Sequence, residues 1–202
     1  MQAFIEACES GALDADIGLV IGNNPGAAGL DSAAAAGIET ACVDHREFDT
    51  REAFDAALVQ RLQARDVDLV ILAGFMRILT PVFIEPFFGR LFNIHPSLLP
   101  KYPGLNTHQR ALDAGDEVAG VTVHFVTPEL DGGPPVLQAQ VPVHPDDDAA
   151  SLAARVLELE HVIYPLAARW FLDGRLQLRA DGAYLDGDAL PRTGVQYHEG
   201  LG

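Results

Sequence analysis

Hydrophobic residues along this chain gather in short continuous runs, and the stretches between the runs place apolar residues at helical spacing. Strands are predicted at residues 17–21, 68–73, 90–94, 120–126 and 136–143. Helices are predicted at residues 32–36, 49–65 and 151–171. Because strands alternate with helices, the pattern predicts an α/β fold built on a sheet.

Local features mark the ends of the predicted helices. Asp49 is a candidate N-cap for the helix at residues 49–65. Three aspartates at residues 146–148 precede the long helix, where acidic side chains interact favourably with the helix dipole. Pro165 falls inside that helix and is expected to kink or break it, because proline lacks the amide hydrogen that the helix uses.

The length and composition fit one globular domain. The chain has 202 residues, 49% of them hydrophobic, which is enough to bury a substantial core. We expect a single domain at residues 1–190 and a mobile tail at residues 191–202, where glycine and polar residues predominate. No apolar run of about 18 residues and no basic-then-apolar start is found. We therefore expect a cytoplasmic protein with no membrane partner.

The net charge of −16 argues against one class of partner. Contacts with nucleic-acid phosphates need clustered Lys and Arg side chains, which this chain lacks, so no nucleic-acid partner is expected. The two cysteines, Cys8 and Cys42, have neither the spacing of a metal site nor the density of a disulfide scaffold. The sequence implies no metal.

Residues 93–104 carry the strongest candidate chemistry. Side chains alternate along the preceding strand, so Asn93 and His95 point the same way, and the prolines that follow end regular structure. An amide and a histidine that converge can stabilise the oxyanion of an acyl transfer. Asp131, in a turn-rich loop, is the candidate that favours the protonated histidine. Taken singly, His95 is also typical of a strand end and Asp131 of a turn.

Together with their surroundings, these residues resemble a known family. The resemblance runs in family order through LAGFMRIL (72–79), NIHPSLLPKYPG (93–104), THQ (107–109), GVTVHFVT (120–127), ELDGG (129–133) and EHVIYP (160–165). The family is the folate-dependent phosphoribosylglycinamide formyltransferases of purine synthesis, which have a Rossmann-like fold. The resemblance thus implies a doubly wound α/β fold, with a mostly parallel sheet and helices on both faces. The resemblance implies that residues 1–190 form a catalytic domain that transfers a formyl group from 10-formyltetrahydrofolate to glycinamide ribonucleotide, on the route to IMP.

The resemblance also implies the site residues. Asn93, His95 and Asp131 match the asparagine, histidine and aspartate of the family's formyl-transfer site. Folate contacts are implied for Arg51, Met76, Arg77, Ile78, Leu79 and Asn93, and a contact with the ribotide sugar for Glu160. The implied partners are these two small molecules. The folate is a cosubstrate consumed in each turnover, and no cofactor is bound permanently. We expect a monomer or a homodimer.

One part of the family pattern is missing. Family members begin with an apolar strand and a Gly/Ser/Asn-rich loop that holds the ribotide phosphate, whereas residues 1–8 here resemble the helix after that loop. Loss of a central strand leaves backbone groups of its neighbours unpaired, which is costly. We therefore hypothesise that the start of the sequence is assigned too late. The competing hypothesis is a real truncation that binds folate but is catalytically impaired.

Two other functions compete with formyl transfer to the ribotide. A 10-formyltetrahydrofolate hydrolase uses similar Asn, His and Asp residues to pass the formyl group to water, but its relatives carry a regulatory domain ahead of the catalytic one. A non-catalytic folate-binding module has no need of the set formed by Asn93, His95 and Asp131. The loop at residues 101–104 looks more like the ribotide enzyme, so the sequence predicts the transferase.

Overall fold

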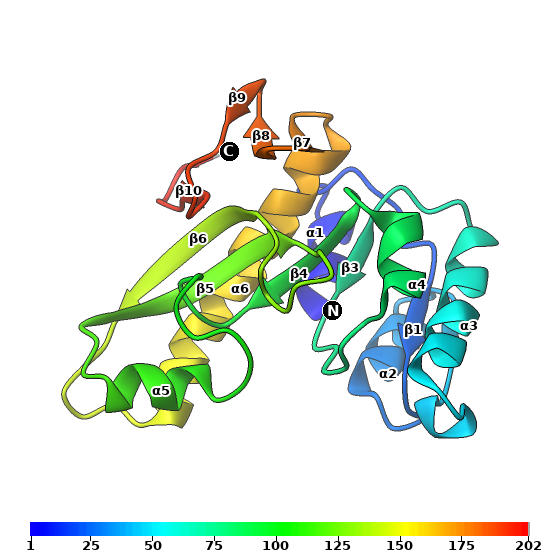
Figure 1. Cartoon of the computed structure of the whole chain (residues 1–202), viewed down its shortest axis with the longest axis horizontal. Helices are drawn as coiled ribbons and strands as arrows, with labels where there is room; N and C mark the ends of the chain where they lie inside the picture. Colours follow the sequence, from blue (N-terminus) through cyan, green and yellow to red (C-terminus); the bar gives the residue numbers. More distant parts are fainter. Residues whose placement is uncertain (202) are drawn as a thin grey trace.

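The computed structural model describes residues 1–201, and its centre is a five-stranded sheet in the order β10-β6-β5-β4-β3 (Figure 1). The strands of this sheet are β3 (Val70–Leu72), β4 (Leu91–His95), β5 (Val118–Phe125), β6 (Pro135–Pro142) and β10 (Val195–Gln196). A two-stranded sheet pairs β1 (Val20–Gly22) with β2 (Thr40–Cys42). A three-stranded sheet contains β7 (Leu176–Arg179), β8 (Gly182–Leu185) and β9 (Asp188–Ala189).

The direction of each strand decides which strand ends meet. β3 runs parallel to β4, β1 to β2 and β10 to β6, whereas β5 runs antiparallel to both of its neighbours. The doubly wound α/β class with a mostly parallel arrangement is therefore confirmed. Because β3 and β4 are parallel neighbours, their carboxyl ends lie at the same edge of the sheet, where α/β folds bind ligands.

Helices cover both faces of the sheet. α1 (Gln2–Glu9), α5 (Thr107–Asp113) and α6 (Ala149–Leu172) pack around the larger core, and α6 crosses behind β5 and β6 (Figure 1). α3 (Arg51–Gln63) and α4 (Pro81–Ile84) enclose a second core with β3, and α2 (Ala28–Ala35) packs on β1 and β2. Short 3₁₀ turns occupy His45–Glu47 and Glu85–Phe87. None of the helices within residues 1–201 has the length and apolar character needed to cross a membrane.

Two details of the predicted helices differ from the structure. The N-cap of α3 is Thr50, whose Oγ1 accepts a hydrogen bond of 3.1 Å from the Ala53 backbone, so Asp49 is not the cap. Adjacent residues with capping side chains cannot be separated by sequence spacing alone. Pro165 does not break α6, which continues to Leu172. Its neighbours are buried against the sheet, and this packing outweighs one missing helical hydrogen bond.

Residues 191–201 contact the body of the protein. Val195–Gln196 form β10, which pairs with β6, and the Tyr197 backbone N–H donates a hydrogen bond of 2.7 Å to the Gln138 carbonyl. The side chains of Tyr197 and Leu201 pack against the larger core. Mobility of residues 191–202 stays a prediction, and Gly202 lies outside the described residues.

The strands β1 and β3 belong to separate sheets. Within residues 1–201, no strand pairing joins them, although Ile21 of β1 and Val70 of β3 border the same core. The extra strand that the family pattern leads us to expect stays a prediction.

Tyr164 of α6 ties the helix to β3 and β4. Its hydroxyl lies 2.8 Å from the Leu72 carbonyl oxygen and 3.0 Å from that of Phe92, and burial raises the pKa of Tyr164 well above its usual value. We expect Tyr164→Phe to lower the free energy of unfolding by about 1–2 kcal/mol, because a buried hydrogen bond is lost. Urea denaturation measures this. Tyr184→Phe, which removes an exposed hydroxyl bonded to Asp181, is the control, and an equal effect in both variants would contradict the expectation.

Candidate active site

The end of β4 presents polar side chains on one face of the sheet. Asn93 and His95 share that face, whereas Phe92 and Ile94 pack into the larger core on the other. The antiparallel register with β5 places Asn93 directly opposite His124. Since residues that face each other across two strands have close Cβ atoms, this register brings a second histidine to the site.

The ring of His95 is buried and held through one nitrogen. Its Nε2 lies 2.9 Å from the backbone carbonyl oxygen of Tyr102, and a carbonyl only accepts, so Nε2 carries a hydrogen. The other nitrogen, Nδ1, lies 3.5 Å from Oδ2 of Asp131. This distance suits an ion pair but is long for a hydrogen bond. A protonated His95 therefore has an Nδ1 hydrogen that is free to meet a substrate.

Asp131 lies in the loop between β5 and β6, and glycines give this loop its shape. Asp131 has a φ of +49°, in the left-handed region, and its Oδ2 accepts a hydrogen bond of 2.8 Å from the Gly104 backbone N–H. A Cβ on Gly133 would lie 1.8 Å from the Phe125 carbonyl oxygen, so only glycine fits there. The loop thus folds back close to its own strand, and its carboxylate bonds to the loop that follows β4.

Sequence alone did not single out His124, which completes this cluster. Its Nδ1 lies 2.9 Å from the Phe125 carbonyl oxygen and its Nε2 lies 3.2 Å from Nδ2 of Asn93. Burial lowers the pKa of His124, so the ring is neutral at physiological pH. A neutral ring that donates from Nδ1 accepts at Nε2, so one amide hydrogen of Asn93 points to His124. This bond fixes which way the Asn93 amide faces.

A signal for His124 exists in the sequence of β5. Val121, Val123 and Phe125 are buried in the larger core, and the polar Thr122 and His124 alternate with them. This alternation assigns His124 to the face opposite the core. Its partner, however, depends on the register between two strands, which the sequence pattern does not specify.

The neutral, buried His124 predicts how stability depends on pH. His124 has the ordinary pKa of about 6.5 in the unfolded chain and a lower pKa in the folded chain. Below pH 6.5 the unfolded chain therefore takes up a proton more readily, and the stability present above pH 6.5 is lost as the pH falls from 6.5 through the pKa of the folded chain. His124→Gln removes this titrating group. As the pH is lowered, the unfolding free energy of the variant should fall less steeply than that of the wild type, with the two slopes differing by up to about 1.4 kcal/mol per pH unit. Urea unfolding at a series of pH values measures the slope. His198→Gln, at an exposed ring, should keep the wild-type slope; an unchanged slope in His124→Gln would refute the argument.

The residues expected to contact folate are grouped mainly on the loop after β3. The side chains of Met76 and Ile78 are 74% and 54% exposed, so both are accessible to a ligand. The Arg77 guanidinium carbon lies 5.5 Å from the centre of the Phe54 ring. Leu79 is buried in the second core, so only its backbone is left for a ligand. Arg51 begins α3 and is exposed.

Glu160 lies on α6, apart from this cluster. Among residues 1–201, no hydrogen bond or ion pair links it to Asn93, His95 or Asp131. Burial raises the pKa of Glu160, and the positive charge of the amine of Met1 partly opposes this shift. α1 packs against α6, which brings this carboxyl group close to the first residue of the chain.

Comparisons with known proteins agree with the resemblance. Residues 1–168 match the model of the family described as formyl transferase. The chain is 50% identical over 199 residues to the phosphoribosylglycinamide formyltransferase of Escherichia coli (strain K12), which covers 98% of this chain and 94% of that protein. The protein of the same name from Haemophilus influenzae is 50% identical over 194 residues, or 96% and 92% of the two chains. The solved phosphoribosylglycinamide formyltransferase of Coxiella burnetii, in complex with CHES, has a TM-score of 0.92 at 43% identity and covers 98% of this chain and 93% of that chain.

Proposed function

This chain belongs to the formyl transferase family, and we propose that it transfers the formyl group of 10-formyltetrahydrofolate to the amine of glycinamide ribonucleotide, in purine synthesis toward IMP. The observation that carries the proposal is the buried pair of His95 and Asp131, 3.5 Å apart, beside an Asn93 amide that His124 orients. Relatives of nearly the same length, named for this reaction, support the choice of substrate.

In the proposed reaction, the neutral amine of the ribotide attacks the formyl carbon, and the formyl oxygen takes up negative charge. Two donors face that oxygen. Asn93 keeps a second amide hydrogen after bonding to His124, and a protonated His95 keeps its Nδ1 hydrogen for the substrate, since it is the Nε2 hydrogen that Tyr102 accepts. Donors that are oriented before the reaction stabilise an oxyanion without the cost of reorganisation.

The intermediate then collapses, and the bond between the formyl carbon and the folate nitrogen breaks. The attacking amine loses one proton and the folate nitrogen gains one, so the transfer is balanced without a covalent bond to the enzyme. We assign this proton transfer to Asp131, directly or through a water molecule. Its Oδ2 also lies 3.5 Å from Nδ1 of His95, within reach of the ring that meets the formyl oxygen.

The remaining residues are assigned to substrate binding. The exposed side chains of Met76 and Ile78 and the backbone of Leu79 border the folate ring, and Arg51 and Arg77 supply positive charge for its anionic tail. Glu160 accepts hydrogen bonds from the ribotide sugar. The folate donor is a cosubstrate, with no cofactor bound permanently, and the enzyme acts in the cytoplasm as a monomer or homodimer.

Release of tetrahydrofolate by the purified chain, with and without glycinamide ribonucleotide, tests this function. We expect release that depends on the ribotide. Release that is equally fast without the ribotide would instead favour the hydrolase. Saturable binding of the folate in a titration, with no release in either case, would favour a binding module.

A further inference from the structure

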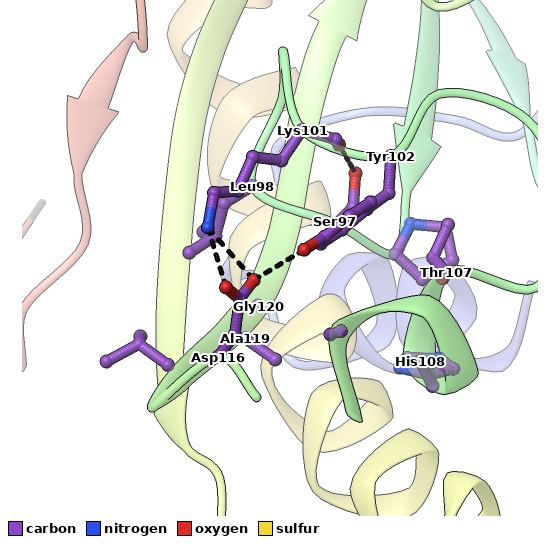
Figure 2. Close-up of a pocket in the computed structure, with 12 residues that line it drawn as sticks. Ser97, Leu98, Lys101, Tyr102, Thr107, His108, Asp116, Ala119 and Gly120 are labelled. Carbon is purple, nitrogen blue, oxygen red and sulfur yellow. Dashed lines mark hydrogen bonds and ion pairs between the residues drawn. The ribbon is translucent and has the colours of Figure 1, made fainter. Parts of the chain in front are cut away.

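A carboxylate outside the described site holds the loop that follows β4. Asp116, just before β5, accepts hydrogen bonds from Nζ of Lys101 at 2.9 and 3.0 Å and from the hydroxyl of Tyr102 at 2.9 Å (Figure 2). The side chain of Asp116 is only 16% exposed, and its hydrogen bond with Lys101 lowers its pKa. Lys101, the sole lysine of the chain, is therefore committed to this contact.

The backbone of this loop is held from several sides. Tyr102 has a φ of +55°, which a non-glycine residue adopts only when its surroundings hold it there. Ser97 Oγ donates a hydrogen bond of 2.6 Å to the Lys101 carbonyl oxygen (Figure 2). The guanidinium carbon of Arg110 lies 5.1 Å from the centre of the Tyr102 ring. Nη1 of Arg110 donates a hydrogen bond of 2.6 Å to the Pro103 carbonyl oxygen.

The same short segment contacts both members of the His95–Asp131 pair. The Tyr102 carbonyl oxygen accepts from Nε2 of His95, and the Gly104 N–H donates to Oδ2 of Asp131. A shift of the backbone at Tyr102 therefore moves the acceptor that fixes the His95 ring. Displacements of about 1 Å at such a contact are enough to cost a large part of the rate.

The space enclosed by this cluster is too small for a substrate. A cavity of about 10 Å³ lies among Ser97, Lys101, Tyr102, His108 and Asp116, which leaves room for one water molecule at most (Figure 2). The cluster thus acts on the loop and not on a ligand of its own.

We propose that Asp116 is a positioning residue for His95: by binding the side chains of Lys101 and Tyr102, it holds the Tyr102 carbonyl oxygen against Nε2 and so keeps the Nδ1 hydrogen directed at the formyl oxygen. That the Nδ1 hydrogen points toward the formyl oxygen rests on the proposed function. That Asp116 fixes the position of the His95 ring does not, so the two statements can be tested separately.

Asp116→Ala tests the proposal through kinetics. We expect kcat to fall roughly tenfold, with KM for the folate within about twofold, because the variant misplaces a reacting group without touching either substrate.

Two further variants separate positioning from folding. Tyr102→Phe keeps the ring but loses the bond to Asp116, and we expect a smaller fall in kcat than in Asp116→Ala. Asp116→Asn keeps an oxygen acceptor and should restore most of kcat. Asp147→Ala, which removes a carboxylate bonded to Arg155 at the start of α6, is the matched control and should lower stability while leaving kcat unchanged.

A spectroscopic measurement separates this proposal from the proposed function. In protein labelled with ¹⁵N-histidine, the Nε2 hydrogen of His95 should exchange with solvent slowly in the wild type and at least about tenfold faster in Asp116→Ala. This result is expected whether or not the chain transfers formyl groups. Equal exchange rates in the two proteins, or a kcat of Asp116→Ala that matches the wild type, would overturn the proposal.

Discussion

His95→Ala should lower kcat by roughly 100- to 1,000-fold, the usual cost of removing one donor to an oxyanion. The ring contributes the Nδ1 hydrogen. Asn93 does not replace this donor, because one of its two amide hydrogens is already bonded to His124. Binding of the folate should change by about twofold or less, because a donor that acts mainly in the transition state contributes little to ground-state binding.

Steady-state kinetics with the ribotide, and a folate titration by fluorescence, measure these two quantities for His95→Ala. His144→Ala is the matched control, since this histidine is exposed in the turn before α6 and should retain wild-type kcat. A kcat for His95→Ala that stays within about threefold of the wild type would remove the ring from the mechanism.

Asp131→Asn should reduce turnover by roughly 100-fold or more, in the range expected for the loss of a proton-transfer group. The substitution preserves the size of the side chain and an oxygen that can accept from the Gly104 N–H, so the loop should keep its conformation. It removes the charge that lies 3.5 Å from Nδ1 of His95, and with it the group that takes the proton from the attacking amine.

Single-turnover formyl transfer measures the chemical step of Asp131→Asn directly. Asp113→Asn, on α5, alters a carboxylate that accepts a hydrogen bond from Gln109 at the surface, and should behave as the wild type. If Asp131→Asn retained full single-turnover rates, the carboxylate would have a structural role in the loop and no role in proton transfer.

Much of the fold follows from local patterns. The strands at β4, β5 and β6 and the long helix α6 are predicted nearly to their ends, because each carries a strong period or a clear cap. Strand direction does not follow from these local patterns. The reversal of β5 depends on how two strands pair across the sheet, and the local sequence pattern of a strand is much the same in either direction.

The same distinction applies to the site residues, some of which follow from local patterns while others depend on strand register and loop structure. Strand alternation alone predicts that Asn93 and His95 share a face. The turn-rich loop makes Asp131 a candidate, and the resemblance then matches it to the family's site. His124 and the carbonyl group of Tyr102 were missed. The first depends on the register of β5 against β4, and the second is a backbone atom whose position depends on a loop held by Asp116. The alternation in β5 indicates the face on which His124 lies, but neither the strand register nor the position of the Tyr102 carbonyl follows from residue types or spacing.

The fate of the formyl carbon tests the central claim most directly. Incubation of the chain with glycinamide ribonucleotide and 10-formyltetrahydrofolate labelled with ¹³C in the formyl group, followed by ¹³C NMR, distinguishes the two products by chemical shift. We predict that the label appears in the formamide of the ribotide, with tetrahydrofolate formed in equal amount. Label recovered as free formate, at a rate that does not depend on the ribotide, would contradict the account.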